Sequence, residues 1–161
     1  MQLTQFSDYS LRVVLYLAAQ PDRIVTVREV SDAYGISAHH LVKVTTRLIE
    51  LGVVISVRGR NGGLRLGRPA HTIDVGALVR ATEPHFNLVE CFDPATNTCP
   101  IDGACRLKVL LRDAQEAFLR ELDGHTVTEL LSRAPTLMRL WRSRREAEQG
   151  SVVSRAGRTR R

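Results

Sequence analysis

The sequence lacks the features that place a protein in a membrane or in the secretory route. Although 43% of its residues are hydrophobic, no apolar run reaches the ~18 residues that a membrane-spanning helix needs. The opening residues, MQLTQFSDYS, contain neither the basic region nor the apolar region of a secretory signal. We therefore expect a cytoplasmic protein with no membrane partner.

Cysteine is scarce, with three residues among 161. All three, Cys91, Cys99 and Cys105, lie in one segment, CFDPATNTCPIDGAC, so that three unrelated thiols are the least favoured interpretation. Thiols stay reduced in the cytoplasm, where clustered cysteines more often bind metal or sense redox state than form disulfides. Their spacing is neither that of a zinc finger nor a CxxC redox motif. Structural zinc, a disulfide-switching sensor and an iron–sulfur cluster all stay open.

Acidic residues are outnumbered by basic ones, 17 against 23, which gives a net charge of +6 and a pI near 9.9. This excess indicates an anionic partner, with nucleic acid first and a membrane surface second. The terminal RAGRTRR raises the pI without defining a site. The positions of the remaining cations must therefore decide whether the chain binds nucleic acid.

Three helices are predicted in the first third of the chain. The first is capped by Ser7 and runs to about Gln20, with apolar residues at the spacing of one buried helical face. The second covers about 27–34, and the third is capped by Ser37 and stops at Gly52. Two helices joined by a tight turn indicate a helix-turn-helix, whose second helix enters the major groove of DNA.

Two capping boxes mark predicted helix starts. Thr26 with Glu29 opens the second helix, which Gly35 ends, and Thr126 with Glu129 opens a short helix, TVTELLSR, further along. Such a box satisfies two backbone N–H groups reciprocally, so it fixes where a helix begins.

A hairpin is predicted directly after the third helix. Two β-prone runs flank GRNGG, whose glycines and asparagine supply the positive φ that a tight tip needs. A hairpin in this place makes a winged helix, and its cations reach phosphates or the adjacent minor groove. The predicted DNA-binding residues come from the third helix and the wing: Ser37, His39, His40, Lys43, Arg47, Arg58, Arg60, Asn61 and Arg65.

The second half of the chain contains a loop and a long helix. A short helix from about Ile73 to Thr82 leads to a segment without periodicity. The long helix that follows has an apolar seam, which the short remaining chain cannot cover: Leu107, Leu110, Leu111, Ala114, Phe118 and Leu122. Burying this seam against a second copy predicts a homodimer that presents two recognition helices to a palindromic site.

The predicted fold class is mainly α with a small β-wing, a winged helix-turn-helix domain plus a long dimerisation helix. The predicted divisions are a DNA-binding domain at 1–82, a cluster-binding loop at 83–102, a dimerisation helix with a following short helix at 103–135, and a basic C-terminal tail at 136–161, disordered from about Gly150.

Three stretches together resemble one family of regulators. The opening MQLTQFSDYSLRVVLYLA, the wing VVISVRGRNGGLRL and the three-cysteine loop resemble the IscR-like winged-helix regulators, and among them the repressors that sense nitric oxide. The likeness covers about residues 1–135. It implies a homodimeric repressor that binds a palindromic operator in double-stranded DNA. It also implies an iron–sulfur cluster on Cys91, Cys99 and Cys105, with 4Fe-4S preferred over 2Fe-2S, and release of DNA when nitric oxide nitrosylates the cluster.

The fourth cluster ligand departs from the family pattern. IscR-like members have a histidine shortly after the third cysteine, where this chain has Leu107 and Lys108. The crossed helices of the family's dimer bring the cysteine loop of one subunit near the first helix of the other, which implies Asp8 as the ligand. Arg12 lies one turn on and can hold Asp8 by an i, i+4 ion pair. The alternatives are Asp93, Asp102, Glu90 and His85.

Other classes of function fit the sequence less well. A zinc-dependent enzyme would need a positioned general base such as the H-x-E signature, and no such pairing is present, so we expect no enzyme. The second alternative is a protein-binding helix-turn-helix scaffold with structural zinc, which salt-dependent binding to a palindromic duplex would exclude. The closest alternative is a winged-helix regulator whose zinc or redox-thiol site senses another signal.

Overall fold

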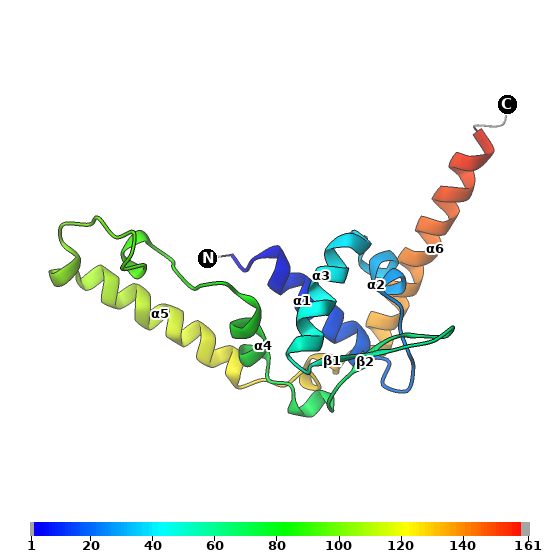
Figure 1. Cartoon of the computed structure of the whole chain (residues 1–161), viewed down its shortest axis with the longest axis horizontal. Coiled ribbons are helices and arrows are strands. Elements are labelled where there is room, and N and C mark those ends of the chain that lie inside the picture. Colours follow the sequence, from blue (N-terminus) through cyan, green and yellow to red (C-terminus); the bar gives the residue numbers. More distant parts are fainter. Residues whose placement is uncertain (1, 159–161) are drawn as a thin grey trace.

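The structure is a computed structural model that describes the backbone of residues 2–158 and the side chains of residues 2–147 (Figure 1). Its helices and strands, in chain order, are α1 (Gln5–Ala18), α2 (Val27–Tyr34), α3 (Ala38–Glu50), β1 (Val54–Val57), β2 (Gly63–Leu66), α4 (Val75–Thr82), α5 (Arg106–Asp123) and α6 (Ala134–Arg158). The predicted fold class is confirmed: the chain is mainly helical with one two-stranded antiparallel sheet.

The first helix begins earlier than the sequence predicts. Thr4, not Ser7, is its N-cap, and the Thr4 side chain accepts a hydrogen bond from the Ser7 backbone N–H at 3.3 Å. Ser7 lies inside the first turn and is fully buried. Glu83 holds the cap from outside, because its carboxylate accepts from the Thr4 backbone N–H at 2.7 Å. The start of α1 is thereby tied to the end of α4.

The helix-turn-helix forms as predicted. The capping box of Thr26 and Glu29 is complete, and Gly35 ends α2 with φ +65°. On α3, Leu41, Val44 and Leu48 are buried against the core beneath α1 and α2. The Ser37 side chain makes no capping hydrogen bond, although Ser37 occupies the N-cap position. This difference leaves its hydroxyl group available at the surface.

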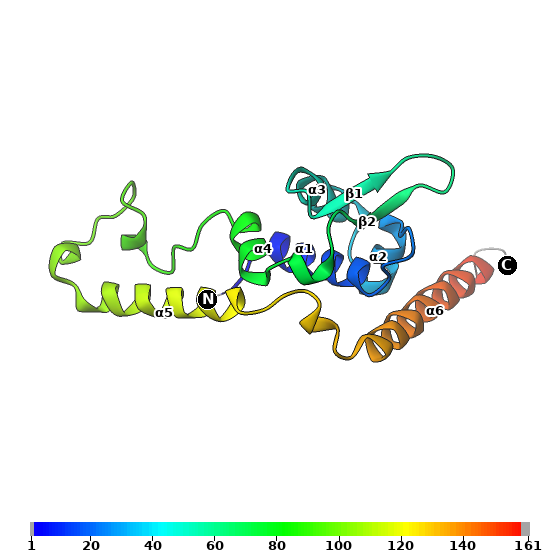
Figure 2. The same cartoon turned by 90° about the horizontal axis from the view of Figure 1, so that it is seen from below.

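The wing is a short hairpin in register Val54↔Leu66 to Val57↔Gly63. A bridge between Val25 and Leu64 joins it to the chain between α1 and α2. Gly59 at the tip has φ +117°, the backbone conformation that the glycine cluster predicts. Figure 2 shows α3 and the hairpin on one side of the molecule, away from α5 and α6.

The predicted helix at Ile73 starts two residues later, at Val75, because the Asp74 side chain caps it by accepting from the Ala77 N–H at 2.6 Å. A two-pronged ion pair between Arg80 of α4 and Asp123 of α5 joins the two helices where α5 ends. Figures 1 and 2 show α5 extending away from the helical core beyond this junction.

The region after α5 differs from the prediction. The box of Thr126 and Glu129 opens only a 3-10 turn, Glu129–Leu131, because the Glu129 N–H bonds to the Thr126 backbone carbonyl and not to its side chain. The Thr126 hydroxyl donates instead to the Glu129 carboxylate at 2.9 Å. The Thr126 backbone N–H also donates to the Glu129 carboxylate at 3.3 Å, and this is the one half of the reciprocal box that is present.

The segment predicted as a basic tail at 136–161 is helical as far as Arg158. Helix α6 covers Ala134–Arg158, and the predicted disorder from Gly150 conflicts with its helical backbone; residues 159–161 lie outside the described residues. Trp141 of α6 is 7% exposed and packs on Tyr16, with ring centroids 4.8 Å apart, and on Tyr34 at 5.6 Å. A large aromatic contact between distant segments thus docks α6 onto α1 and α2.

No helix within the described part of the chain has the length and apolar character needed to cross a membrane.

Candidate DNA interface and cysteine loop

Helix α3 presents a polar face opposite its buried stripe. Each of the predicted DNA-binding side chains of this helix is exposed. Lys43 and the two histidines make no ion pair with other described residues, whereas Arg47 pairs with Glu50 at 3.1 Å. Unpaired groups near the N-terminal part of a recognition helix are free to contact base edges and phosphates.

His40 is oriented by α1. Its ring stacks on Tyr9 with centroids 6.3 Å apart and an interplanar angle of 27°. A groove of about 160 Å³ lies beside this pair, lined by Phe6 and Lys43 among others. The sequence gives no sign of this contact, because Tyr9 and His40 belong to helices that meet only in the folded chain.

The wing places its cations outward. Arg58, Arg60 and Asn61 are exposed at the tip, and Arg65 is exposed on β2 because its neighbour Leu64 faces the core. Alternation along a strand sends successive side chains to opposite faces, so the buried leucine fixes the arginine outward. The wing and α3 lie on the same side of the molecule (Figure 2), and their predicted DNA-binding cations are exposed.

The three cysteines occupy different positions in the 83–105 segment. Cys91 lies in a 3-10 turn, Glu90–Phe92, and Cys105 is the N-cap of α5, where its sulfur accepts from the Lys108 N–H at 3.4 Å. The Cys99 backbone N–H donates to the Asn97 side chain at 3.1 Å. All three thiols are free and half-buried. The segment, predicted as structureless, thus contains local turns that the absence of periodicity conceals.

A polar clamp closes the loop between the first two cysteines. Glu90 accepts hydrogen bonds from the backbone N–H and the hydroxyl of Thr98, both at 2.7 Å. These bonds hold the pKa of the Glu90 carboxyl below its ordinary value. Because Glu90 precedes Cys91 and Thr98 precedes Cys99, the clamp joins the neighbours of two thiols. Sequence reasoning missed it, since the two residues are paired only by the path of the loop.

The loop also packs on the start of α5. Asp102 forms an ion pair with Lys108, and the Arg112 guanidinium lies 5.6 Å from the centre of the Phe92 ring. These contacts hold both ends of the cysteine segment against one helix. The neighbourhoods of Cys91 and Cys105 are therefore supported by the same helix, and the Asp102 N–H donates to the Cys99 carbonyl at 3.3 Å.

Within the described residues of a single chain, no three side chains of histidine, cysteine, aspartate or glutamate are gathered at one point suitable for a metal ion. The donors nevertheless fit iron in their chemistry, because three free thiols can supply the thiolates that hold iron–sulfur clusters. The chain provides suitable donor atoms without assembling them.

The predicted ion pair of Asp8 is confirmed. The Arg12 Nη2–Asp8 Oδ2 distance is 2.7 Å and the Nε–Oδ1 distance is 2.9 Å, a two-pronged contact on α1. The Arg12 guanidinium also lies 5.7 Å from the centre of the Tyr34 ring. Asp8 is half-exposed at the start of α1.

The alternative fourth ligands are engaged in different ways. Asp102 and Glu90 already have the partners described above, and Asp93 accepts from the Ala95 N–H at 3.0 Å. His85 is exposed, and its Nδ1 accepts from the Asn87 N–H at a long 3.4 Å.

Comparison with known proteins places the chain among regulators of transcription. The family model Rrf2, described as an iron-dependent transcriptional regulator, matches residues 3–133. The regulator NsrR of Halalkalibacterium halodurans is 47% identical over 141 residues, covering 87% of this chain and 97% of the relative. NsrR of Shouchella clausii is 48% identical over 132 residues, covering 81% and 89%. The predicted resemblance is confirmed.

Solved structures share the fold. IscR of T. potens has a TM-score of 0.67 at 21% identity, covering 83% of this chain and 88% of its own. The global cysteine regulator CymR of B. subtilis has a TM-score of 0.65 at 23% identity, covering 82% and 97%. At these identities the matches support the architecture alone.

Proposed function

The chain belongs to the Rrf2 family of iron-dependent transcriptional regulators, and from this premise we propose that it is a homodimeric iron–sulfur repressor that releases its operator in response to nitric oxide. The observation that carries the proposal is the exposed, cationic side formed by α3 and the wing. Its partner is double-stranded DNA, so its place of action is the cytoplasm, and it is not an enzyme.

The homodimer is supported by the exposed part of the α5 seam. Leu107 and Leu110 are 60% and 63% exposed, while Leu119 on the opposite side of the helix is buried against the chain. Contact of such large apolar side chains with water is unfavourable, and a second copy of α5 would bury them. Two heads related by a two-fold axis then read the halves of a palindromic operator.

The cluster ligands we propose are Cys91, Cys99 and Cys105 of one subunit and Asp8 of the other. When bound, the cluster, 4Fe-4S in our proposal, supplies iron that reacts with nitric oxide. A carboxylate is a harder and more exchangeable donor to iron than a thiolate, which suits a sensor. Arg12 holds Asp8 ready in the absence of the cluster, and the clamp between Glu90 and Thr98 keeps the first two cysteine neighbourhoods together.

The chain couples this site to the DNA-binding face through its own contacts. The cysteine loop begins at Glu83, whose carboxylate caps the start of α1 through Thr4. Helix α1 in turn carries Tyr9, on which His40 of the recognition helix stacks. Movement of the loop on loss of its ligands therefore changes the support of α1 and the placement of α3, and affinity for the operator falls.

The test begins with protein purified without air. We expect iron and sulfide in the sample, salt-dependent binding to a palindromic duplex, and loss of that binding during titration with nitric oxide. Removal of iron by a chelator should weaken binding in the same way. Protein that contains no iron, or whose binding is unchanged when iron is removed, contradicts the cluster proposal.

Ligand variants separate the donors. Replacing Cys91, Cys99 or Cys105 by Ser should each lower the iron content, and Asp8→Ala should alter the absorbance of the cluster while iron is retained. Asp22→Ala is the matched control, because Asp22 is an exposed acid away from the loop. If Asp8→Ala and Asp22→Ala have identical absorbance and nitric-oxide response, Asp8 is not the fourth ligand.

A redox-thiol site is the second candidate, favoured by the three free thiols that the single chain does not gather around one point. In that case oxidation of the metal-free protein, and not the loss of iron, would control DNA binding. A zinc site would be colourless and would contain no sulfide. Metal and sulfide analysis together with thiol counting before and after oxidation distinguishes the three sites.

A further inference from the structure

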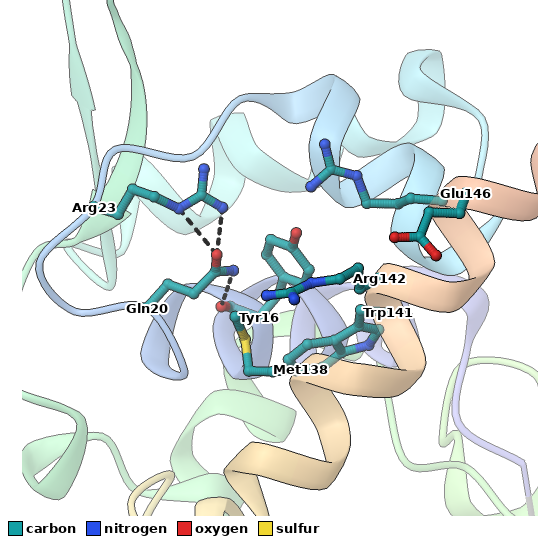
Figure 3. Close-up of a pocket in the computed structure, with 8 residues that line it drawn as sticks. Tyr16, Gln20, Arg23, Met138, Trp141, Arg142 and Glu146 are labelled. Atoms are coloured by element: carbon teal, nitrogen blue, oxygen red, sulfur yellow. Dashed lines mark hydrogen bonds between the residues drawn. The ribbon is translucent and has the colours of Figure 1, made fainter. Parts of the chain in front are cut away.

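A cavity of about 430 Å³ lies where α6 crosses the end of α1 (Figure 3). It is distinct from the cysteine loop and from the face formed by α3 and the wing. Tyr16 contributes from α1, Arg23 from the loop after it, and Met138, Trp141 and Arg142 from α6. Its volume falls within the range of small-molecule sites.

The cavity is rich in positive charge. Three arginines line it, Arg23, Arg142 and Arg145, against one acid, Glu146. Glu29 of α2 lies behind them and pairs with Arg23 at 2.7 Å and with Arg145 at 3.7 Å. Even when Glu29 is counted, cations exceed acids by one, three against two. An anion entering the cavity would therefore meet an unbalanced positive field.

Two of these arginines are already committed. Burial works against ionisation of Glu29, but hydrogen bonds from Arg23 and the Thr26 backbone N–H, with the charges of Arg23 and Arg145, hold the pKa of Glu29 below its ordinary value. Glu29 is thus a charged anchor for its two arginines. Gln20 adds a second anchor, because its side-chain oxygen accepts from the Arg23 Nε at 3.0 Å.

Arg142 differs from the other two. Among the described residues it forms no ion pair or hydrogen bond, and Figure 3 shows its side chain directed into the cavity beside Tyr16. A guanidinium presents a planar fork of donors that matches a carboxylate or phosphate in two-pronged geometry. Arg142 is therefore the group available to receive an anion.

The apolar part of the cavity is formed by two aromatic residues and a methionine. Tyr16 and Trp141, whose rings meet at 4.8 Å, form its wall together with the thioether of Met138. Aromatic rings pack favourably against such surfaces, and methionine sulfur adapts to them. A ligand that joins a ring to an anionic group would match both halves of the site.

We propose that this cavity binds a small anion consisting of an aromatic or heteroaromatic ring that carries a carboxylate or a phosphate, with Arg142 holding the anionic group. The ring would lie against Trp141 and Tyr16. Binding would join α6 to the end of α1 and to the turn before α2. The proposal does not depend on the iron–sulfur cluster or on nitric oxide.

The chain contains its own reporter for this site. Trp141 is its single tryptophan, so intrinsic tryptophan fluorescence of the full-length protein reports on the cavity wall. We would titrate the purified protein with benzoate and with adenosine monophosphate, and with benzamide, acetate and inorganic phosphate as probes that have only a ring or only an anion. Saturable quenching by benzoate, the nucleotide or both, and not by the other three, supports the proposal.

The two ring-bearing anions distinguish the source of the ligand. Response to benzoate alone assigns a carboxylate ligand, and response to the nucleotide alone assigns a phosphate ligand. Arg142→Gln should weaken binding of the responding probe about tenfold or more, since it removes a charge-assisted hydrogen-bond pair. Arg139→Gln is the matched control, an exposed arginine of the same helix that does not line the cavity, and it should leave binding unchanged.

Three results would overturn the proposal. One is that neither ring-bearing anion quenches saturably. Another is that benzamide quenches as well as benzoate, and the third is that Arg139→Gln weakens binding as much as Arg142→Gln. Because Arg142 is exposed and unpaired, its replacement should not unfold the chain, and circular dichroism of the variant verifies this. The titration is repeated on protein from which iron has been removed. The result for the cavity ligand is then independent of whether the iron–sulfur proposal holds.

Discussion

Gly35 meets two separate constraints at a single residue. Its φ of +65° is a backbone conformation that side chains with a β-carbon rarely adopt, and a β-carbon placed there would collide with the Arg144 guanidinium of α6. Gly52 has the same φ with open space around it. The two glycines therefore separate backbone strain from contact with α6.

We expect Gly52→Ala to lower the free energy of unfolding by about 1–2 kcal/mol, the strain of a left-handed residue. Gly35→Ala should lower it further, because Arg144 must also move. Gly103→Ala is the control, since Gly103 has neither a positive φ nor a neighbour within 4 Å. Urea denaturation of the three variants measures the differences. Equal losses for Gly35→Ala and Gly52→Ala would show that the Arg144 contact is easily relieved.

Individual residues also show where sequence reasoning stops. Arg12 was predicted to pair with Asp8, because a spacing of four residues on a helix fixes the geometry locally. That Thr4 and not Ser7 caps α1 was not predictable, because serine and threonine are both good N-caps. Glu83, from the end of a distant helix, holds Thr4 in this role. The cysteines were found because all three lie in one segment, whereas the Glu90 clamp around them depends on a path that no pattern encodes.

At the scale of elements, α5 is divided between two surroundings. The predicted seam is split, with Leu111, Phe118 and Leu122 half-buried against the chain, and Leu107 and Leu110 exposed. A helix that buries one flank internally and leaves the next flank apolar is ready to pack against another copy. The exposed flank is where a substitution should disturb assembly without unfolding the subunit.

We expect Leu110→Asp to convert a dimer into a monomer, because an ionised carboxylate cannot be buried unpaired in an apolar interface. Arg120→Gln is the control, since it changes the net charge equally on an exposed position away from the leucines. Sedimentation equilibrium measures the mass. A Leu110→Asp protein that remains dimeric would place the interface elsewhere, and a monomeric Arg120→Gln protein would point to charge and not to burial.

The corner after α5 should respond to pH. The His125 Nδ1 lies 2.8 Å from the Glu129 carboxylate, and Glu121 is 3.8 Å from the other nitrogen; the hydrogen bond with Glu129 raises the pKa of His125 from 6.5. A histidine whose pKa is higher in the folded state than in the unfolded state contributes stability that is fully present below the unfolded-state pKa. This contribution is lost as pH rises through the folded-state pKa.

The urea midpoint of the parent protein should therefore exceed that of His125→Gln most below pH 6.5, and the difference should shrink above it. His71→Gln, at an exposed histidine without an ion pair among the described residues, should show no such trend. A difference that grows with rising pH would contradict the assigned partner.

Helices and strands were predictable where local sequence signals specify them. They were not predictable where contacts between distant segments determine the structure. The capping box of Thr26, the stop at Gly35 and the glycine cluster of the wing specify α2 and the hairpin from sequence alone. The segment 136–161 is arginine-rich, so composition predicted a basic tail, disordered from about Gly150, and no docked helix. Burial of Trp141 against two tyrosines docks α6 instead, a contact between ends of the chain that periodicity cannot show.

At the scale of the whole molecule, the positive charges fall into groups on different sides of the fold. Helix α3 and the wing, whose cations are exposed, lie on one side of the molecule, whereas α6 lies on the other (Figure 2). The net charge of +6 treats these groups alike, and only the fold shows which of them can meet DNA. Salt dependence of binding can count the phosphates neutralised and so identify the side that binds.

We expect Arg60→Gln, at the exposed wing tip, to reduce the steepness of the salt dependence by about one unit for each subunit that contacts a phosphate, or about two units for a dimer on a palindromic duplex. Arg139→Gln removes the same charge from α6 and should leave the slope unchanged, because a distant charge displaces no counterion from DNA. Fluorescence anisotropy across a series of salt concentrations measures both slopes. If Arg139→Gln flattens the slope as much as Arg60→Gln, the whole positive surface and not the wing would be neutralising the phosphates, and the winged-helix mode of binding proposed for this chain would be wrong.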